Sequence, residues 1–315
     1  MGRYIAKRFV LLIIIIFFVS VAAFFLVHLL PGNPAVAILG PNDTPQNAAI
    51  LNHQLGLDKS LWQQYFIWIS HVFGGNLGQS FTTHQTTTSI LSQSFPIDIE
   101  LIIFSQLLAF IIALPMAITA SRRPNRLFDQ LSNGVAFGML ALPPFVIGPV
   151  LVLIFAVHWR VFPGPASYVP LTQNFGSNLH TMLLPSIVLA LGSIVVYFRL
   201  LRNDLIATLQ EDFITMARSK GLSSRFIMWR HAFRPSTFSL LAGAGVNIGA
   251  LIAGTFVVEY LFALNGLGYT LVQAVYQRDY LVVQGISLVV AIAYVVLQFV
   301  IDFVFTVVDP RVTRG

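Results

Sequence analysis

Six long apolar stretches constrain this chain more than any other feature of its sequence. A bilayer core is about 30 Å thick, so a helix needs about 20 apolar residues to cross it. The stretches that reach this length lie at residues 9–30, 97–120, 131–157, 182–200, 237–264 and 283–307. The first exceeds the apolar run of a signal peptide, so we expect it to remain as an anchor. The sequence thus predicts an all-α polytopic membrane protein with six transmembrane helices.

The composition agrees with a lipid environment and excludes several kinds of chemistry. Hydrophobic residues make up 56% of the chain and charged residues 10%, whereas soluble domains carry about 25% charged residues. The absence of cysteine excludes a thiol nucleophile and a thiolate metal site. The histidines form no HExxH or HxxxH pair, and no lysine follows a glycine as in a Walker A loop. We therefore expect no catalytic site, metal site or cofactor on this chain.

The basic residues predict the orientation of the chain in the membrane. Six spans place both termini on one side, and that side carries all but three of the 18 lysines and arginines. The exceptions are Lys59, Arg160 and Arg278. Because basic loops stay in the cytoplasm, we expect both termini to be cytoplasmic. Topology then explains the net charge of +6, and we expect no nucleic-acid partner.

These spans suggest a division of the chain into two parts. Residues 1–96 comprise the first span and an extracytoplasmic segment at 31–96. Residues 97–315 form a core with the other five spans and a cytoplasmic loop at 201–236.

The external segment contains one predicted interfacial helix, at Ser60–Val72. Its spacing of apolar residues is helical and rich in aromatics, as in the belts that lie at membrane surfaces. The residues of this stripe are Leu61, Tyr65, Trp68 and Val72. Two interpretations stay open, a seat on the lipid surface and a docking surface for an external partner.

Several residues in the predicted spans are candidates for a pathway or gate. Glu259 is an acid near the outer end of the fifth span, where a purely structural role is the alternative. Gly245 and Gly249 form a GxxxG pair that lets helices approach closely, at a pathway, at an interface with another subunit or in internal packing. Pro143 and Pro144 predict a kink or break in the third span.

The loop between the fourth and fifth predicted spans carries the most information. It contains an apolar stripe at helical spacing, which Gly221 ends as a helix-terminating glycine would. The members of the stripe are Leu205, Leu209, Phe213 and Met216. Ser223 or Ser224 then caps a second short helix that holds Phe226, Trp229 and Phe233. Such an element suits docking into the groove of a partner, and a hairpin lying on the surface is the alternative.

This loop resembles that of a known family. Residues 212–222, DFITMARSKGL, followed by RHAFR at 230–234, look like the coupling loop of ABC-importer permeases, in the version used by peptide permeases. Further segments that resemble the same family occur in order along the chain. Among them are PGNP at 31–34, GNLG at 75–78, NGLG at 265–268, RDY at 278–280 and DPR at 309–311. Thr215 and Met216 stand where the generic loop has Glu and Ala.

The resemblance implies a type I importer permease fold in a bacterial cytoplasmic membrane. Its partners would be a second homologous permease, two cytoplasmic ATPase subunits that bind ATP and Mg, and an extracytoplasmic solute-binding protein. The residues that it assigns to ATPase coupling are Asp212, Thr215, Met216, Ala217, Arg218, Lys220 and Gly221. The implied cargo is dipeptides or oligopeptides, and nickel, glutathione or haem stay open.

Two other classes of protein remain as alternatives, a channel or secondary carrier and a membrane enzyme. A secondary carrier needs an ion-coupling acid near the middle of the membrane, but the acids of this chain lie toward the ends of the spans. An ATP-independent channel and a membrane enzyme would both leave residues 212–221 without a purpose, and the enzyme would also need a polar cluster that the sequence does not show.

Overall fold

A computed structural model describes residues 2–28, 39, 44–54 and 56–308. The described chain is helical, apart from loops and one isolated bridge between Gln79 and Thr86. Five helices are long and apolar enough to cross a membrane. They are α1 (Gly2–His28), α5 (Thr87–Arg122), α8 (Phe175–Leu209), α11 (Phe233–Phe262, continuous with the preceding turns) and α13 (Tyr280–Val308). The shorter helices are α3 (Pro45–Gln54), α4 (Leu61–Phe73), α9 (Asp212–Ser219), α10 (Ser224–Phe226) and α12 (Leu267–Tyr276).

The third apolar stretch is broken, as its two prolines predict. α6 (Leu127–Ala141) and α7 (Pro144–Leu151), which continues as a π-helical turn to His158, meet at an angle of 103°. Pro143 is extended, with ψ at 150°, and Pro144 begins the new helix. The cause is local, because a residue before proline avoids the α conformation and proline fits the first turn of a helix. The predicted break in the stretch at 131–157 is therefore confirmed, and the count is five candidate spans, or six if this bent pair is one.

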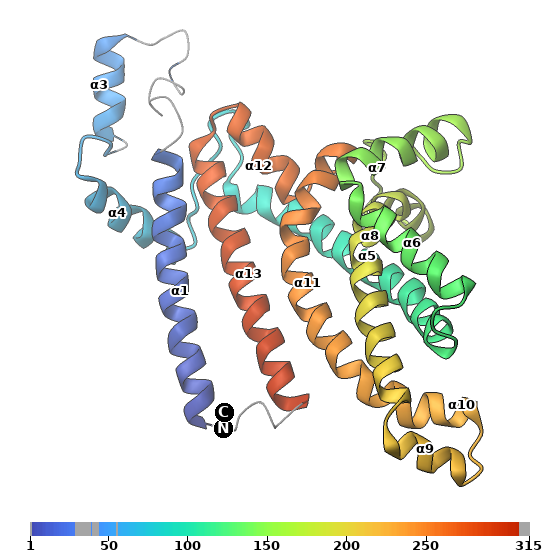
Figure 1. Ribbon diagram of the computed structural model, residues 1–315. Helices are drawn as coiled ribbons and strands as arrows, with labels where there is room; N and C mark the ends of the chain where they lie inside the picture. The colour runs from blue at the N-terminus through green and yellow to red at the C-terminus, as the bar shows by residue number, and fades with distance from the viewer. Residues whose placement is uncertain (1, 29–38, 40–43, 55, 309–315) are drawn as a thin grey trace. The chain divides into compact units, whose positions relative to one another are not determined.

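Contacts divide the chain into two compact units, which differ from the predicted division at residue 97. Residues 1–97 and 265–315 form the first unit, and residues 98–264 form the second. The last long helix therefore packs with the first one. In the first unit, α1 and α13 lie side by side and run antiparallel (Figure 1).

The aromatic helix α4 packs against α1 rather than lying wholly on a surface. Tyr65 and Trp68 are only 2% and 9% exposed and pack with Phe24 of α1. The Tyr65 hydroxyl also lies 2.8 Å from Ser20 Oγ. These two aromatics therefore hold α4 against α1. Exposed neighbours such as Trp62 remain available for contact with an external surface.

Segments that are far apart in sequence, and that carry the family resemblance, pack together in the first unit. Gly78, with a φ of +92°, lies against Leu281. Ser80 Oγ donates a hydrogen bond of 2.5 Å to Asp279 Oδ2, and Thr82 Oγ1 donates one of 3.2 Å to the same oxygen. The stretch around GNLG and the stretch around RDY thus contact each other.

Gly285 allows a close approach between α13 and α5, and this predicts a double-mutant effect. A Cβ at residue 285 would lie 2.5 Å from Thr87 Cγ2. Overpacking of this kind costs about 1–3 kcal/mol, so we expect Gly285→Ala to lower the thermal stability of the purified protein. Thr87 is fully buried and its hydroxyl has no hydrogen-bond partner among the described residues. Adding Thr87→Ala should therefore restore the stability that Gly285→Ala loses. If Gly285→Ala costs the same stability in the wild type and in the Thr87→Ala background, the two residues are not in contact.

In the second unit, α8 and α11 form an antiparallel pair that is tightly packed (Figure 1). A Cβ on Gly243 would collide with Leu200 of α8, and one on Gly254 would lie 3.3 Å from Leu189 Cδ1. Gly245 and Gly249 are also buried within α11. Gly243 and Gly254 thus bring these two helices together, and the role of Gly245 and Gly249 stays a prediction.

Candidate functional site

The loop between α8 and α11 begins with a sharp turn. α8 ends at Leu209 and α9 starts anew at Asp212, with Glu211 as its N-cap in an extended conformation. The predicted continuous stripe is therefore wrong in its second half. Phe213 and Met216 are 42% and 55% exposed, because the turn rotates them away from the core that buries Leu205.

Two other residues hold α9 in place. Ile214 is fully buried and Ala217 is 6% exposed, and both belong to the core that α8 and α11 build. Ala217 thus makes its close contact within the chain. The remaining residues predicted for coupling are exposed on one short element. They are Asp212, Thr215, Met216, Arg218, Lys220 and Gly221.

Gly221 ends α9 through its backbone conformation. Its φ is +78°, and no atom lies within 4 Å of where its Cβ would be. The Gly221 N–H donates to Arg218 O at 2.9 Å, and the Leu222 N–H donates to Ala217 O at 3.3 Å. The turn closes through a residue whose backbone is in the left-handed conformation. Glycine is therefore needed for its backbone conformation, and not because a side chain would lack room.

The second half of the loop leads directly into α11. The Ser223 side chain accepts a hydrogen bond from the Phe226 N–H at 3.3 Å, which confirms the predicted cap. A π-helical turn over Ile227–Ala232 then joins α10 to α11. Figure 1 shows α9 and α10 together at the end of the α8–α11 pair. The whole loop is therefore one folded element fixed to two long helices.

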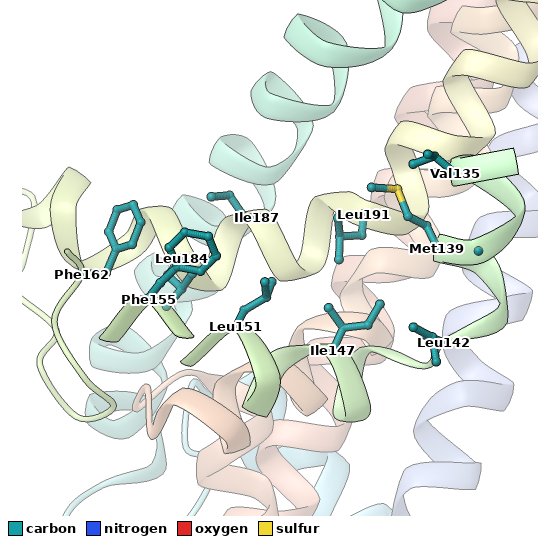
Figure 2. A pocket seen from close by; sticks show the side chains of 11 residues that line it. Val135, Met139, Leu142, Ile147, Leu151, Phe155, Phe162, Leu184, Ile187 and Leu191 are labelled. Atoms are coloured by element: carbon teal, nitrogen blue, oxygen red, sulfur yellow. The ribbon is translucent and has the colours of Figure 1, made fainter. Parts of the chain in front are cut away.

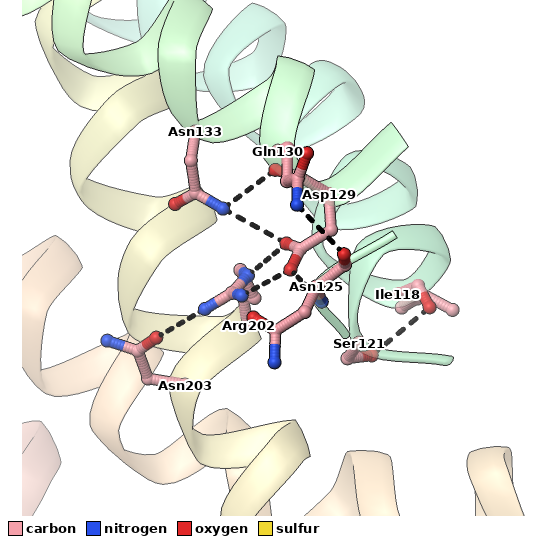
Figure 3. Close-up of polar contacts among 8 residues, drawn as sticks. All are labelled: Ile118, Ser121, Asn125, Asp129, Gln130, Asn133, Arg202 and Asn203. Atoms are coloured by element: carbon pink, nitrogen blue, oxygen red, sulfur yellow. Dashed lines mark hydrogen bonds and ion pairs between the residues drawn. The ribbon is translucent and has the colours of Figure 1, made fainter. Parts of the chain in front are cut away.

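A buried ion pair lies close behind this loop, and sequence reasoning missed its acid. Arg202 of α8 binds both carboxylate oxygens of Asp129 in α6, with Nε···Oδ1 and Nη2···Oδ2 distances of 2.5 Å (Figure 3). The two side chains are 15% and 2% exposed. Arg202 stands seven positions before the end of α8, about 10 Å along the helix axis.

Further hydrogen bonds fix the carboxylate of Asp129. Asn125 has a φ of +63°, and its N–H donates to Asp129 Oδ2 at 2.8 Å. Asn133 Nδ2 donates to Asp129 Oδ1 at 3.0 Å. The α5–α6 turn is thereby tied to the helix that carries the loop. The sequence signal that could have found this site is an acid near the start of an apolar helix with asparagines four residues to either side.

A second polar cluster joins three long helices inside the second unit. Asn247 of α11 donates to Ser193 Oγ at 2.6 Å and to the Tyr197 hydroxyl at 3.1 Å, both in α8. The Tyr197 hydroxyl in turn donates to Gln106 of α5. Polar side chains that bond across helices stabilise packing in a membrane. Only ionisable groups in the spans were expected to carry a function, so this cluster was not predicted.

Glu100 fixes the connection that precedes α8. Its Oε2 accepts hydrogen bonds from Tyr168 at 3.1 Å and from Asn178 Nδ2 at 2.8 Å. Burial, together with the charge of Glu100, raises the pKa of the Tyr168 hydroxyl well above its usual value. Tyr168 therefore stays protonated and acts as a donor.

The bend between α6 and α7 encloses a cavity against α8. Its volume is about 530 Å³, and all of its lining residues are apolar (Figure 2). Met139, Leu151 and Leu191 point toward its centre (Figure 2). A peptide backbone would find no hydrogen-bond partner there, so this cavity suits an apolar group. The prolines at 143 and 144 create the bend, and Leu142 and Ile147 on either side of them line the cavity.

The candidate gate residue Glu259 lies fully buried in α11. It does not line the apolar cavity. Among the described residues, no group of three or more histidines and acids could hold a metal ion. The exposed α9–α10 element, with the ion pair behind it, is thus the site that the geometry singles out.

Comparisons with known proteins cover nearly the whole chain. A family described as the N-terminal part of binding-protein-dependent transport system membrane components matches residues 1–102. The family of binding-protein-dependent transport system inner membrane components matches residues 109–314. The chain is 32% identical over 313 residues to the dipeptide transport system permease protein DppB of Lactococcus lactis, covering 99% of both chains. It is 31% identical over 335 residues to DppB of Escherichia coli K12, again with 99% of both chains covered. The glutathione transport system permease protein GsiC of another Escherichia coli strain is 32% identical over 314 residues, with the same coverage.

Proposed function

The chain belongs to the family of binding-protein-dependent transport system inner membrane components, and from this premise we propose that it forms the translocation pathway of an ATP-driven importer of dipeptides or oligopeptides. The names of its full-length relatives support a peptide cargo. Glutathione, the cargo named for another relative, is itself a small peptide. We expect separate ATPase subunits to supply the energy, because no lysine of this chain follows a glycine as in a Walker A loop.

The proposed topology has six spans with both termini in the cytoplasm. The bent α6–α7 pair counts as one span in this topology. The antiparallel packing of α1 and α13 supports it, because Gly2 and Val308 then lie at the same end of their unit (Figure 1). The loops on that side carry the excess of basic residues, which is the reason for assigning that side to the cytoplasm. The segment at 31–96 is then extracytoplasmic, where a solute-binding protein delivers the cargo.

The proposed coupling element is α9, seated in a groove of an ATPase subunit. The observation that carries this proposal is an exposed helix with two large apolar side chains, Phe213 and Met216, held on a folded loop. Exposed apolar side chains that gather on a fixed element are typical of a docking surface. A second, homologous permease would present its own loop to the other ATPase subunit.

The contacts behind α9 suggest how its motion reaches the membrane. Ile214 and Ala217 anchor α9 in the core between α8 and α11, so these elements move together. The ion pair of Arg202 with Asp129 extends the connection to the α5–α6 turn. Because a packed core does not deform continuously, closure of the ATPase subunits would shift these helices as a group and change the side to which the pathway opens.

Purification and reconstitution test this proposal. The tagged chain, isolated from its native membrane in mild detergent, should bring with it a second permease and ATPase subunits, identified by mass spectrometry. Vesicles that contain this complex, supplied with the solute-binding protein, should accumulate a labelled dipeptide only with ATP. Parallel assays with glutathione, nickel and haem identify the cargo. A chain that is recovered alone and transports without ATP would overturn the proposal in favour of a channel or a secondary carrier.

A further inference from the structure

Four arginines surround one pocket beside the proposed coupling helix. The pocket has a volume of about 670 Å³ and is formed by the end of α5, by α9 and by the start of the following helix. Its basic residues are Arg122, Arg123, Arg218 and Arg225, and no acidic residue lines it. We refer to it as the arginine pocket.

The guanidinium groups of this pocket lack a counter-charge among the described residues. In the part of the chain that the structure describes, none of the four makes an ion pair or a side-chain hydrogen bond. Four positive charges around one hollow repel one another unless an anion lies between them. Guanidinium groups bind phosphate through paired hydrogen bonds, so a phosphate group is the anion that this geometry fits.

The floor and rim of the pocket indicate a ligand that is also partly apolar. Ile227 and Met228, which are 2% and 3% exposed, line it beneath the arginines. Trp229, half exposed, lines it as well. Tryptophan is typical of the level at which lipid headgroups meet the hydrocarbon. A free phosphate ion would leave the half-exposed ring of Trp229 uncovered.

The depth of Arg122 and Arg123 agrees with a headgroup. The second predicted span ends at residue 120, and Arg122 is the last residue of α5, about 3 Å further along the helix axis. The interfacial layer of a bilayer is roughly 5–7 Å thick on each side of the hydrocarbon core. The predicted end of the span therefore places both arginines in the layer that holds phospholipid phosphates.

The pocket also lies apart from the face proposed for the ATPase. At 3.6 residues per turn, Arg218 is roughly 140–160° around the axis of α9 from Phe213 and Met216. A subunit that covers those two apolar side chains leaves the flank with Arg218 free. Arg218 was predicted to take part in ATPase coupling, but on this geometry it faces away from the apolar contact.

We propose that the arginine pocket binds the headgroup of an anionic phospholipid from the cytoplasmic leaflet, such as phosphatidylglycerol. The phosphate lies among the guanidinium groups, and the glycerol and upper acyl chains cover the exposed ring of Trp229. This proposal rests on the proposed orientation, which places the pocket on the cytoplasmic side. A bound lipid would link the end of α5 to the coupling element.

The test uses the assembled importer in nanodiscs that contain phosphatidylcholine and phosphatidylglycerol. After extraction and a detergent wash, native mass spectrometry counts the phospholipids that each complex retains. The wild type should retain phosphatidylglycerol in preference to phosphatidylcholine. The double variant Arg122→Gln/Arg123→Gln should retain at least about tenfold less, since it loses charge-assisted hydrogen bonds. Arg225→Gln, on another wall, should reduce retention independently and is the second variant if the first does not assemble.

Arg126→Gln is the matched control. Arg126 is exposed in the same turn but does not line the pocket, so its variant should retain phosphatidylglycerol as the wild type does. Equal loss in this control, or unchanged retention in the other variants, would overturn the proposal. Complete displacement by excess inorganic phosphate would overturn it in favour of a soluble anion. Loss of the ATPase subunits with lipid retained would instead assign the arginines to a subunit contact. A wild-type complex without ATPase subunits would contradict the proposed function, whatever lipid it holds.

Discussion

Replacing Asp129 with alanine is expected to destabilise the second unit by about 3–5 kcal/mol, the usual cost of breaking a buried ion pair by removing one partner. The variant leaves the Arg202 side chain, 15% exposed, without its counter-charge. It also removes the oxygen that accepts from the Asn125 N–H. Chemical denaturation of the purified protein, or its unfolding temperature in detergent, measures this loss.

Two further variants separate the charge from the packing. Apolar replacement of both partners, Asp129→Leu with Arg202→Leu, should recover much of the stability, because neither charge is then left buried alone. Asp204→Asn, in the same helix as Arg202, removes an acid for which the structure gives no partner and should change the stability by less than about 0.5 kcal/mol. A loss with Asp129→Ala no larger than that of Asp204→Asn would contradict the importance of the pair.

The same variants test whether the pair transmits motion. A stable double variant that binds the ATPase subunits but no longer couples ATP hydrolysis to uptake would identify the pair as part of the coupling path. A stable double variant with wild-type uptake would limit the pair to a structural role. The first result would assign the pair a role in coupling, and the second would assign it a role in stability only.

The apolar stretches predicted most of the long helices because lipid imposes one requirement on all of them. Each span must be long and apolar, and it must satisfy its backbone groups internally, so composition alone locates it. The break at Pro143 and Pro144 was predictable for a similar local reason. Its angle of 103° was not, because the packing of α7 against α8 and α11 sets the direction of the second half.

Contacts between distant segments could not be read from the sequence. Tyr65 and Trp68 show the aromatic spacing of an interfacial helix, yet they bury against α1, since an aromatic stripe fits a helix as well as it fits a membrane surface. Asp129 has no local signature of its ion pair, because its partner Arg202 is 73 residues away. The coupling loop was recognisable by resemblance, but which of its residues face outward depends on the turn at Gln210 and Glu211.

Replacing Gly221 with valine is expected to abolish ATP-driven uptake while the protein still inserts into the membrane. The φ of Gly221 is +78°, in a region that costs other residues about 1–2 kcal/mol and β-branched ones more. Because nothing lies within 4 Å of its Cβ position, the substitution creates no clash, and its effect is on the turn alone. A shifted turn moves the end of α9 that the ATPase subunit would contact, whereas the spans remain intact. Uptake by reconstituted vesicles, compared with the amount of chain in the membrane, measures the effect.

Gly221→Asn is the control that isolates backbone conformation as the cause. Asparagine adopts left-handed conformations several times more readily than most residues, and the open space around position 221 accepts its side chain. This variant should therefore keep most of the uptake, although it adds a larger side chain than alanine would. Loss in both variants would indicate that the surface at this position must stay bare for the partner. Full uptake by Gly221→Val would mean that the end of α9 does not contact an ATPase subunit, and the coupling role would then fall to another part of the loop.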